Sequence, residues 1–389
     1  MRSKPDAFII ETFAIGYHLY GEFIMSERLI HWKKLYSFVK RVMMKYDVPE
    51  ESAHYVADNL VVSNLRGIDS HGVGRVKRYV GGIKDGYIIP DISPEIVREN
   101  SVLANVDARN GVGQNAGMFG MNLAIAKGRK DGIGLVTVFN SNHYGFAGYY
   151  AMKALEHDLI GISLTNSEPL VVPTFAKDAI LGTNPISIAV PGSRNRPWVM
   201  DLATSVVPRG KLEVYGRLGQ KTPLGWATDE KGVSTDDPAR VLNNVLHGYG
   251  GGILPLGGEG ELHGGHKGYG LSMMVDVLSG VLSGSNYGPD VVFSKEEAVN
   301  HPRVGHFFMV LDPAFFMDID AFKKRMDDYV DLLHNSNKAE NCPRIYVHGE
   351  KEFEIHDQRE RNGIPLDAKT VESLSGLAEE FGEKIEFID

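Results

Sequence analysis

Residues 69 to 75 read Asp-Ser-His-Gly-Val-Gly-Arg, which places a proton-transferring side chain close to an anion-binding one. A histidine such as His71 titrates near neutrality and can take or return the proton of an alcohol. Arg75 offers a planar fork that matches a carboxylate in two parallel hydrogen bonds, and Ser70 adds a hydroxyl group. An enzyme that oxidises a 2-hydroxy acid needs these groups within one substrate length, and this reaction is our working hypothesis.

A second histidine follows a predicted strand. The run from Gly134 to Phe139 is apolar and β-rich, and Asn-Ser-Asn-His-Tyr-Gly (140–145) comes directly after it. A histidine at the end of a strand, before a glycine turn, is well placed to act as a catalytic base. The alternative is that His143 is a turn histidine that caps the next helix. The local sequence leaves both interpretations open.

A glycine-rich segment, 264–270, precedes a predicted helix that begins at Leu271. Glycines let the backbone approach a ligand closely, and Lys267 adds a positive charge at the helix N-terminus, a combination that suits a phosphate. A flexible loop with a solvated lysine fits these residues equally well. The polar turn Leu-Gly-Thr-Asn-Pro (181–185) lies between two apolar runs and by itself indicates only a β-turn.

Three other kinds of site are disfavoured. The glycines of residues 111–117 are spaced GxGxxxG, and no acidic residue follows at the distance expected of a Rossmann dinucleotide site. His263 and His266, with His247 upstream, could bind zinc, but HExxH is missing and no carboxylate completes the set. The GxSxG elbow of serine hydrolases is absent as well. We therefore predict no metal ion, and a cofactor bound by something other than a Rossmann loop.

Composition narrows the class of protein. The chain has 389 residues, enough for two or three domains. Its net charge of −9, from 41 basic and 50 acidic residues, argues against a nucleic-acid partner. Cys342 is the only cysteine, so no intrachain disulfide can form and a reducing cytoplasm is the expected compartment. No apolar run reaches the roughly 18 residues that span a bilayer, and no membrane partner is expected.

The first residues stand apart from the rest. Residues 7–24 are rather apolar, but Glu11, His18 and Glu22 interrupt them and no small-residue cleavage site follows, which disfavours a secretory signal. A second Met-Ser start at residue 25 opens a well-patterned helix. Residues 1–25 are therefore predicted to be either an extension or a misassigned start.

Hydrophobic periodicity divides the remainder into three parts. Before residue 105 the spacing is helical, and the turn that carries His71 falls between two helices. Between 105 and 300, β-rich runs alternate with helical ones, which indicates an α/β sheet covered on its faces. The predicted strands are 134–139, 160–164, 186–190 and 198–200, and the predicted helices are 114–130, 146–157 and 267–284. After residue 300 the pattern returns to helices, clearest at Phe322–Leu333 and Val371–Phe381. We predict a central sheet domain between two helical ends that pack together.

Six motifs, in the right order throughout, resemble the type 2 malate/L-lactate dehydrogenase family, which includes ureidoglycolate dehydrogenase, 2,3-diketogulonate reductase and sulfolactate dehydrogenase. The motifs are DSHGVGR (69–75), SNHYGFAGYY (141–150), GISLTNSEPLVVPT (161–174), LGTNPI (181–186), MDLATS (200–205) and GGHKGYGLSMMVDVLSGVLSG (264–284). The similarity extends from about residue 26 to the C-terminus, and six ordered motifs are far more specific than any one of them.

The resemblance implies a non-Rossmann, mixed-sheet nicotinamide-binding domain at residues 106–300. It also implies a helical substrate and dimerisation domain formed by residues 26–105 together with 301–389. The implied cofactor is NAD or NADP, and the implied assembly is a homodimer, or a higher oligomer, with active sites near the subunit interface. The implied substrate is a small 2-hydroxy acid, malate or lactate before ureidoglycolate or sulfolactate. The joint presence of catalytic-type and cofactor-type residues disfavours a non-enzymatic binding protein.

The resemblance also implies roles for individual residues, according to their positions in the motifs. His71 and His143 match the two histidines to which proton transfer is assigned in different family members, and Ser70 and Arg75 match substrate contacts. The positions assigned to cofactor contacts are Ser167, Thr183, Asn184, Asp201, Leu202, Ala203, Lys267, Gly268, Gly349, Glu350 and Lys351.

Glu168 departs from the malate and lactate members, which often carry a small residue there, whereas the ureidoglycolate enzymes look acidic. A carboxylate lining the substrate site would disfavour a second substrate carboxylate and favour an amide or hydroxyl donor. The alternative is that Glu168 points to a neighbouring cation or to solvent.

Overall fold

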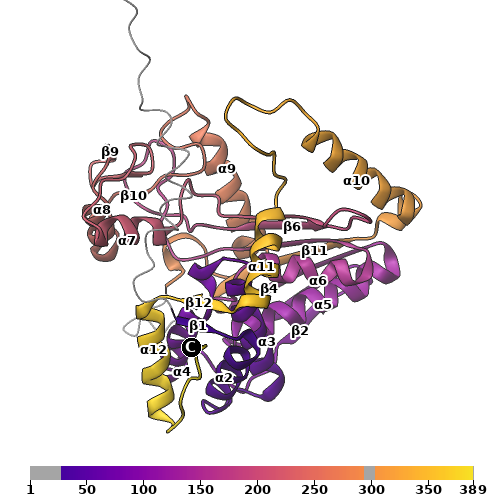
Figure 1. The fold of residues 1–389 in the computed structure, drawn as a ribbon, viewed down its shortest axis with the longest axis horizontal. Coiled ribbons are helices and arrows are strands. Elements are labelled where there is room, and N and C mark those ends of the chain that lie inside the picture. Colours follow the sequence, from indigo (N-terminus) through magenta and orange to yellow (C-terminus); the bar gives the residue numbers. More distant parts are fainter. Residues whose placement is uncertain (1–27, 293–302, 389) are drawn as a thin grey trace, which may run out of the picture.

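The computed structural model describes residues 28–292 and 303–388, so the prediction for residues 1–25 lies outside the described residues. At its centre is a seven-stranded sheet (Figure 1). In spatial order the strands are β2 (Glu95–Glu99), β3 (Leu103–Asp107), β4 (Ile133–Ser141), β11 (Val304–Leu311), β5 (Ile160–Thr165), β6 (Ile186–Val190) and β7 (Trp198–Leu202). Only the β3–β4 pair in this sheet is parallel, so the mixed, non-Rossmann sheet that the resemblance implied is confirmed.

Helices cover both faces of the sheet, and the side chains of β11 show how. Phe308 and Val310 point into a core with α5 (Gly113–Asp131) and α6 (Gly148–Lys153). Their neighbour Phe307 points the other way, into a core with α9 (Gly265–Asp276). This alternation is what a strand buried on both faces requires. A π-helical segment, η4 (Val277–Val281), continues α9.

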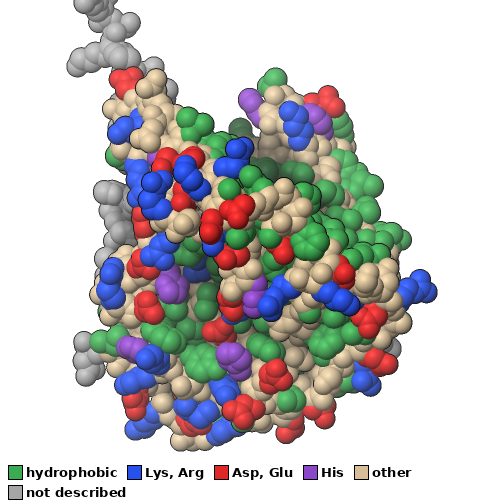
Figure 2. Space-filling view, turned by 90° about the vertical axis from the view of Figure 1, so that its right-hand side faces the viewer, with side chains coloured by type: hydrophobic (Ala, Val, Ile, Leu, Met, Phe, Trp, Pro, Cys, Tyr) green, Lys and Arg blue, Asp and Glu red, His purple; other side chains and the backbone are tan. Residues whose placement is uncertain are grey.

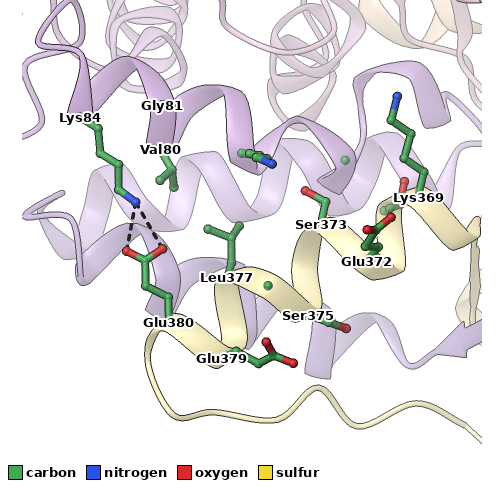
Figure 3. Close-up of a pocket in the computed structure, with 14 residues that line it drawn as sticks. Val80, Gly81, Lys84, Lys369, Glu372, Ser373, Ser375, Leu377, Glu379 and Glu380 are labelled. Carbon is green, nitrogen blue, oxygen red and sulfur yellow. Dashed lines mark hydrogen bonds and ion pairs between the residues drawn. The ribbon is translucent and has the colours of Figure 1, made fainter.

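The two ends of the chain form one helical unit. In Figure 1 the yellow C-terminal helix lies beside the indigo N-terminal ones. The elements are β1 (Arg28–Ile30), α2 (Trp32–Met44), α3 (Glu50–Leu65), α4 (Val76–Lys84), β12 (Ile364–Leu366) and α12 (Ala368–Glu380). Strand β1 pairs with β12, and Leu35, Val56 and Leu374 are fully buried in the shared core. A hollow between α4 and α12 is lined by Lys84, Leu377 and Glu380 among others (Figure 3).

A small three-stranded sheet and the remaining helices complete the fold. The sheet contains β8 (Ala227–Thr228), β9 (Ser234–Thr235) and β10 (Gly252–Ile253), and it packs with α7 (Arg209–Arg217) and α8 (Pro238–His247). Helices α10 (Ile319–His334) and α11 (Glu350–Asn362) follow β11. On the face shown in Figure 2, acidic and basic side chains are interspersed, so neither sign forms a continuous field there.

Most of the predicted elements are confirmed, but the prediction of helices alone after residue 300 is wrong. Residues 304–311 form β11, which lies between β4 and β5 in the middle of the sheet. A strand buried on both faces is a continuous apolar run without alternation, and periodicity alone does not separate such a run from a buried helix. Strands β2 and β3 were not predicted either. The sheet therefore uses residues on both sides of the predicted 106–300 range.

Candidate active site

Helix α3 fixes the turn that carries His71. This turn consists of two short 3-10 segments, η1 (Asp69–His71) and η2 (Val73–Arg75). The side chain of Asn64, near the end of α3, donates to Asp69 Oδ1 (2.6 Å) and accepts from the Val73 amide (2.8 Å). Buried hydrogen bonds of this kind hold a turn in one conformation.

Helix α11 fixes the same turn from the C-terminal part of the chain. Arg359 donates to both carboxylate oxygens of Asp69, at 2.7 and 3.0 Å, which is the two-pronged geometry that arginine favours. The position of His71 therefore depends on residues near both ends of the described chain.

His143 lies in the loop between β4 and α6. Its Nδ1 is 2.8 Å from the hydroxyl of Tyr79 and accepts from the Gly145 amide at 3.3 Å. Gly145 has φ +87°, and a Cβ there would be 1.8 Å from Asn59 Oδ1, so only glycine fits. The ring is oriented through Nδ1, which leaves Nε2 for a ligand.

The fold brings the two histidines together. Their rings stack with centroids 5.7 Å apart and planes 15° apart. The Ser70 hydroxyl lies 2.9 Å from His71 Nδ1, so this ring is also oriented through Nδ1. Both imidazoles can thus present Nε2 to the same small molecule.

Arg75 follows in the same turn. Its Nε donates to the Ser70 carbonyl oxygen at 2.7 Å, which fixes the guanidinium relative to His71. Within residues 28–292 and 303–388, its two Nη nitrogens take part in no hydrogen bond or ion pair, so they are available to a carboxylate.

The pKa values of both histidines are lowered. Burial is the main cause for His71, and the positive charges of Arg75 and Arg78 add to it, so that its pKa falls to about 4. The pKa of His143 falls well below its usual value through burial, and then through Arg78, His71 and Arg75. Both rings are therefore neutral at pH 7 and able to accept a proton. The pKa of Tyr79 rises to about 12 by burial, so its hydroxyl stays protonated.

A third histidine, His306, lies near His143 and was not singled out in the sequence. It is fully buried in β11, where Nε2 is 2.7 Å from Ser141 Oγ and Nδ1 is 2.8 Å from Thr165 Oγ1. Its ring stacks on Tyr144, next to His143, with centroids 4.4 Å apart. Burial lowers its pKa to about 3, so it acts as a neutral support for the 141–145 loop.

Several residues assigned to the cofactor lie at the ends of β5 and β6. Ser167 Oγ accepts from the Thr183 amide (3.0 Å), and Asn184 Oδ1 accepts from the Ser167 amide (3.1 Å). Asn184 also donates to the Ser272 carbonyl oxygen of α9 (3.0 Å), which joins this cluster to the helix that carries Lys267. Gly268, one turn earlier, lies against Leu256, where a Cβ would be 2.0 Å from the carbonyl oxygen.

The remaining cofactor candidates lie near β7. Asp201 Oδ2 accepts from the Gly148 amide at 2.8 Å, and Leu202 and Ala203 continue the strand into the next loop. Gly349 packs on Val199 of the same strand. Glu350 and Lys351 follow Gly349 in the same turn, and the side chains of both have partners within the chain.

The Glu350 carboxylate lies 2.9 Å from His334 Nε2 and 3.3 Å from Arg344. The Lys351 ammonium lies over the Tyr346 ring, 4.7 Å from its centroid.

The residues present fit a nicotinamide dinucleotide. Lys267 is exposed in the first turn of a 12-residue helix, and no ion pair or hydrogen bond of its ammonium occurs in the described part of the chain. A cation beside free helix amides is the donor set that a pyrophosphate needs. Ser167 and Thr183 add hydroxyl groups, and a Cβ on Gly182 would come within 2.3 Å of Ser167 Oγ.

Glu168 has a cationic neighbour. Its Oε1 lies 3.8 Å from Arg209 Nη1, at the start of α7, while Arg209 Nε binds Glu213 at 3.0 Å. The charge of Glu168 also acts on Arg75. Glu168 is therefore close to Arg75, and Arg209 offsets part of its negative charge.

Among the described residues, no three histidine, cysteine, aspartate or glutamate side chains are grouped closely enough to bind a metal ion. No helix in that part of the chain is both long and apolar enough to cross a bilayer.

Tyr79, Asn64 and His306 are the site residues that sequence reasoning missed. Tyr79 follows Arg75 by four residues, the spacing of side chains on one helix face, and that signal could have found it. Asn64 and His306 hold the site turn and the site loop in place from other elements of the fold. No local sequence pattern marks either residue.

The chain is similar to known proteins along most of its length. The model of a protein family described as malate/L-lactate dehydrogenase matches residues 30–375 of the chain. A malate dehydrogenase of Pyrococcus abyssi is 49% identical over 90% of this chain and 94% of its own length. A malate/(S)-sulfolactate dehydrogenase of Methanothermus fervidus is 37% identical over 88% of this chain and 95% of its own. The crystal structure of malate dehydrogenase from Entamoeba histolytica superposes with a TM-score of 0.89, at 36% identity, over 93% of this chain and all of that one.

Proposed function

The chain belongs to the malate/L-lactate dehydrogenase family, and we propose that it interconverts malate and its 2-oxo acid with NAD or NADP. The family and its relatives make the chain a 2-hydroxy acid dehydrogenase. The observation that carries the choice of chemistry is the stack of His71 on His143 beside the unoccupied Nη nitrogens of Arg75. It supplies a proton acceptor and a carboxylate clamp in one place.

In the proposed mechanism Arg75 binds the C1 carboxylate and orients C2. Between the two histidines, hydrogen bonding favours His71 as the base. The Gly145 amide donates to His143 Nδ1, which favours the tautomer with the proton on Nε2. His71 Nδ1 can donate to the Ser70 hydroxyl, which frees its Nε2 to accept the proton of the C2 hydroxyl.

His143 then hydrogen-bonds the same oxygen through Nε2–H, and Tyr79 holds its ring. The bound cofactor supplies the hydride acceptor. In the reverse direction the protonated His71 returns its proton to the oxygen that becomes the hydroxyl. Burial of the ring and its two arginine neighbours make this proton easy to release.

The charges around the site support a substrate with two anionic groups. Arg75 and Arg78 both act on the histidines, and Arg209 offsets Glu168. Such a field attracts a dianion more strongly than the monoanion lactate. A sulfolactate carries the same number of anionic groups and is the second candidate, because relatives of this chain carry that name.

A homodimer in the cytoplasm is part of the proposal. Met273, Val277 and Val281 follow one another at four-residue spacing on α9 and η4, and each is 42% exposed or more. An apolar stripe of this kind on a helix supports burial against a second copy. Light scattering on the purified protein measures the assembly directly. The single cysteine suits a reducing compartment.

The function is tested with a panel of 2-oxo acids and both reduced cofactors. We expect oxaloacetate to give the highest kcat/KM, with 3-sulfopyruvate next and pyruvate lower. The panel also decides between NAD and NADP. If no 2-oxo acid is reduced with either cofactor, the proposed function is wrong.

A further inference from the structure

Asp201 has a role beyond the cofactor contact that its motif suggests. It lies in β7, at the edge of the large sheet, opposite Ser187 of β6. Its Oδ2 accepts from the amide of Gly148 at 2.8 Å, and Gly148 is the first residue of α6. The loop that carries His143 ends at this hydrogen bond.

Gly148 and Asp201 approach each other too closely for any side chain. A Cβ on Gly148 would be 2.7 Å from Oδ2 and 3.3 Å from Cγ of Asp201. Contacts of this length force a neighbour to move. The carboxylate therefore fixes the place of residue 148, and with it the C-terminal end of the loop.

The turn that carries His71 follows Arg66, a buried arginine on whose charge the Asp201 carboxylate acts. Arg66, which caps α3 and lies five positions before His71, is 4% exposed. Its guanidinium lies over the ring of Phe353, 4.4 Å from the centroid, and its buried Nε has no hydrogen-bond partner in the described residues. The nearby carboxylates that act on its charge are Glu352 and Asp201. A buried guanidinium needs such opposite charges.

We propose that Asp201 is a positioning residue, which holds the His143 loop through the Gly148 amide and whose charge acts on Arg66 at the base of the His71 turn. Resting on the proposed function, this assigns its side chain to the alignment of the two histidines rather than to cofactor binding. The loss of either interaction shifts one histidine relative to the other, and misplacement by about 1 Å can cost ~100-fold in rate.

Three variants separate this role from a cofactor contact. Asp201→Ala removes both the acceptor and the charge. Asp201→Asn keeps an acceptor for the Gly148 amide but loses the charge that acts on Arg66. Gly148→Ala leaves Asp201 in the chain but pushes its carboxylate away. Ser187→Ala, on the neighbouring strand, is the matched control.

We expect Asp201→Ala and Gly148→Ala to lower kcat by about 10- to 100-fold, with the NADH or NADPH Kd, measured by fluorescence, within about twofold of the wild type. Asp201→Asn should recover part of the loss in kcat. Ser187→Ala should keep the kcat and the cofactor Kd of the wild type. A Kd that rises more than kcat falls, or an unchanged kcat in both Asp201→Ala and Gly148→Ala, overturns the proposal. If Asp201→Ala does not fold, Gly148→Ala decides alone.

A failure of this proposal is distinct from a failure of the proposed function. In the first case the wild type reduces 2-oxo acids and only the variants disagree with expectation. In the second case the wild type itself shows no activity with any 2-oxo acid.

Discussion

The imidazole of His71 lies nearly parallel to that of His143, with ring centroids 5.7 Å apart. One ring comes from a turn of the helical unit and the other from a loop of the sheet. The stack therefore exists only when the two parts of the chain are docked. Each ring is oriented by a hydroxyl group at its Nδ1, from Ser70 or from Tyr79.

The two histidines should differ in their effect on turnover. Replacing His71 by Ala removes the proposed base and should lower kcat by about 10²- to 10⁴-fold. Replacing His143 by Ala removes a hydrogen bond to the reacting oxygen and should cost about 10-fold. Steady-state kinetics with malate measure both, and His157→Ala, at an exposed position, serves as the control. A larger loss for His143→Ala than for His71→Ala would assign the base to His143.

The Tyr79 hydroxyl should matter through His143. In Tyr79→Phe the ring stays in the core but the hydrogen bond at 2.8 Å to Nδ1 is lost. We expect kcat to fall by about 10-fold while the free energy of unfolding changes by only about 1 kcal/mol. Tyr46→Phe is the matched control, since its hydroxyl binds Glu380 on the surface of the helical unit. Equal kinetic effects of the two substitutions would contradict this role.

The helical ends, the strands β4 to β7 and the six motifs could be predicted because each leaves a local pattern. The middle of the sheet could not. Residues 304–311 are mostly apolar and do not alternate, and their place between β4 and β5 follows from long-range pairing that no local window contains. The partners of the site residues were hidden for the same reason. Arg359 reaches Asp69 from the far end of the chain, and His306 reaches the 141–145 loop through the sheet.

Activity should persist to lower pH than a free histidine allows. The pKa of His71 is about 4, because burial and the charges of Arg75 and Arg78 oppose its protonation. The acid limb of kcat/KM for malate oxidation should therefore lie below pH 5. Arg78→Met removes one of these charges and should move the limb towards higher pH. An acid limb near pH 6.5 in the wild type would contradict the lowered pKa of the His71 ring.

The free energy of unfolding should also decrease as the pH falls. The pKa of His71 is lower in the folded state than in the unfolded one, so the unfolded state binds its proton first as the pH falls. The contribution of the neutral His71 ring to the free energy of unfolding is present above pH 6.5 and is lost as the pH falls towards 4. Thermal unfolding between pH 7 and pH 4 should show a smaller decrease in Tm for His71→Gln than for the wild type.

The pair of Glu168 and Arg209 should set the preference for a second anionic group. The two side chains are 3.8 Å apart and 32% and 43% exposed, so the pair is loose enough for Arg209 to turn towards a substrate anion. Arg209→Met leaves Glu168 uncompensated near Arg75 and should lower kcat/KM for malate at least about 10-fold more than for lactate. Glu168→Gln removes the repulsion and should raise the ratio of malate to lactate. Lys211→Met, on the same helix, is the control because its ammonium lies over Trp226. If Arg209→Met lowers kcat/KM for both substrates equally, Arg209 does not bind the second anionic group. The discrimination between malate and lactate must then come from Arg75 and Arg78.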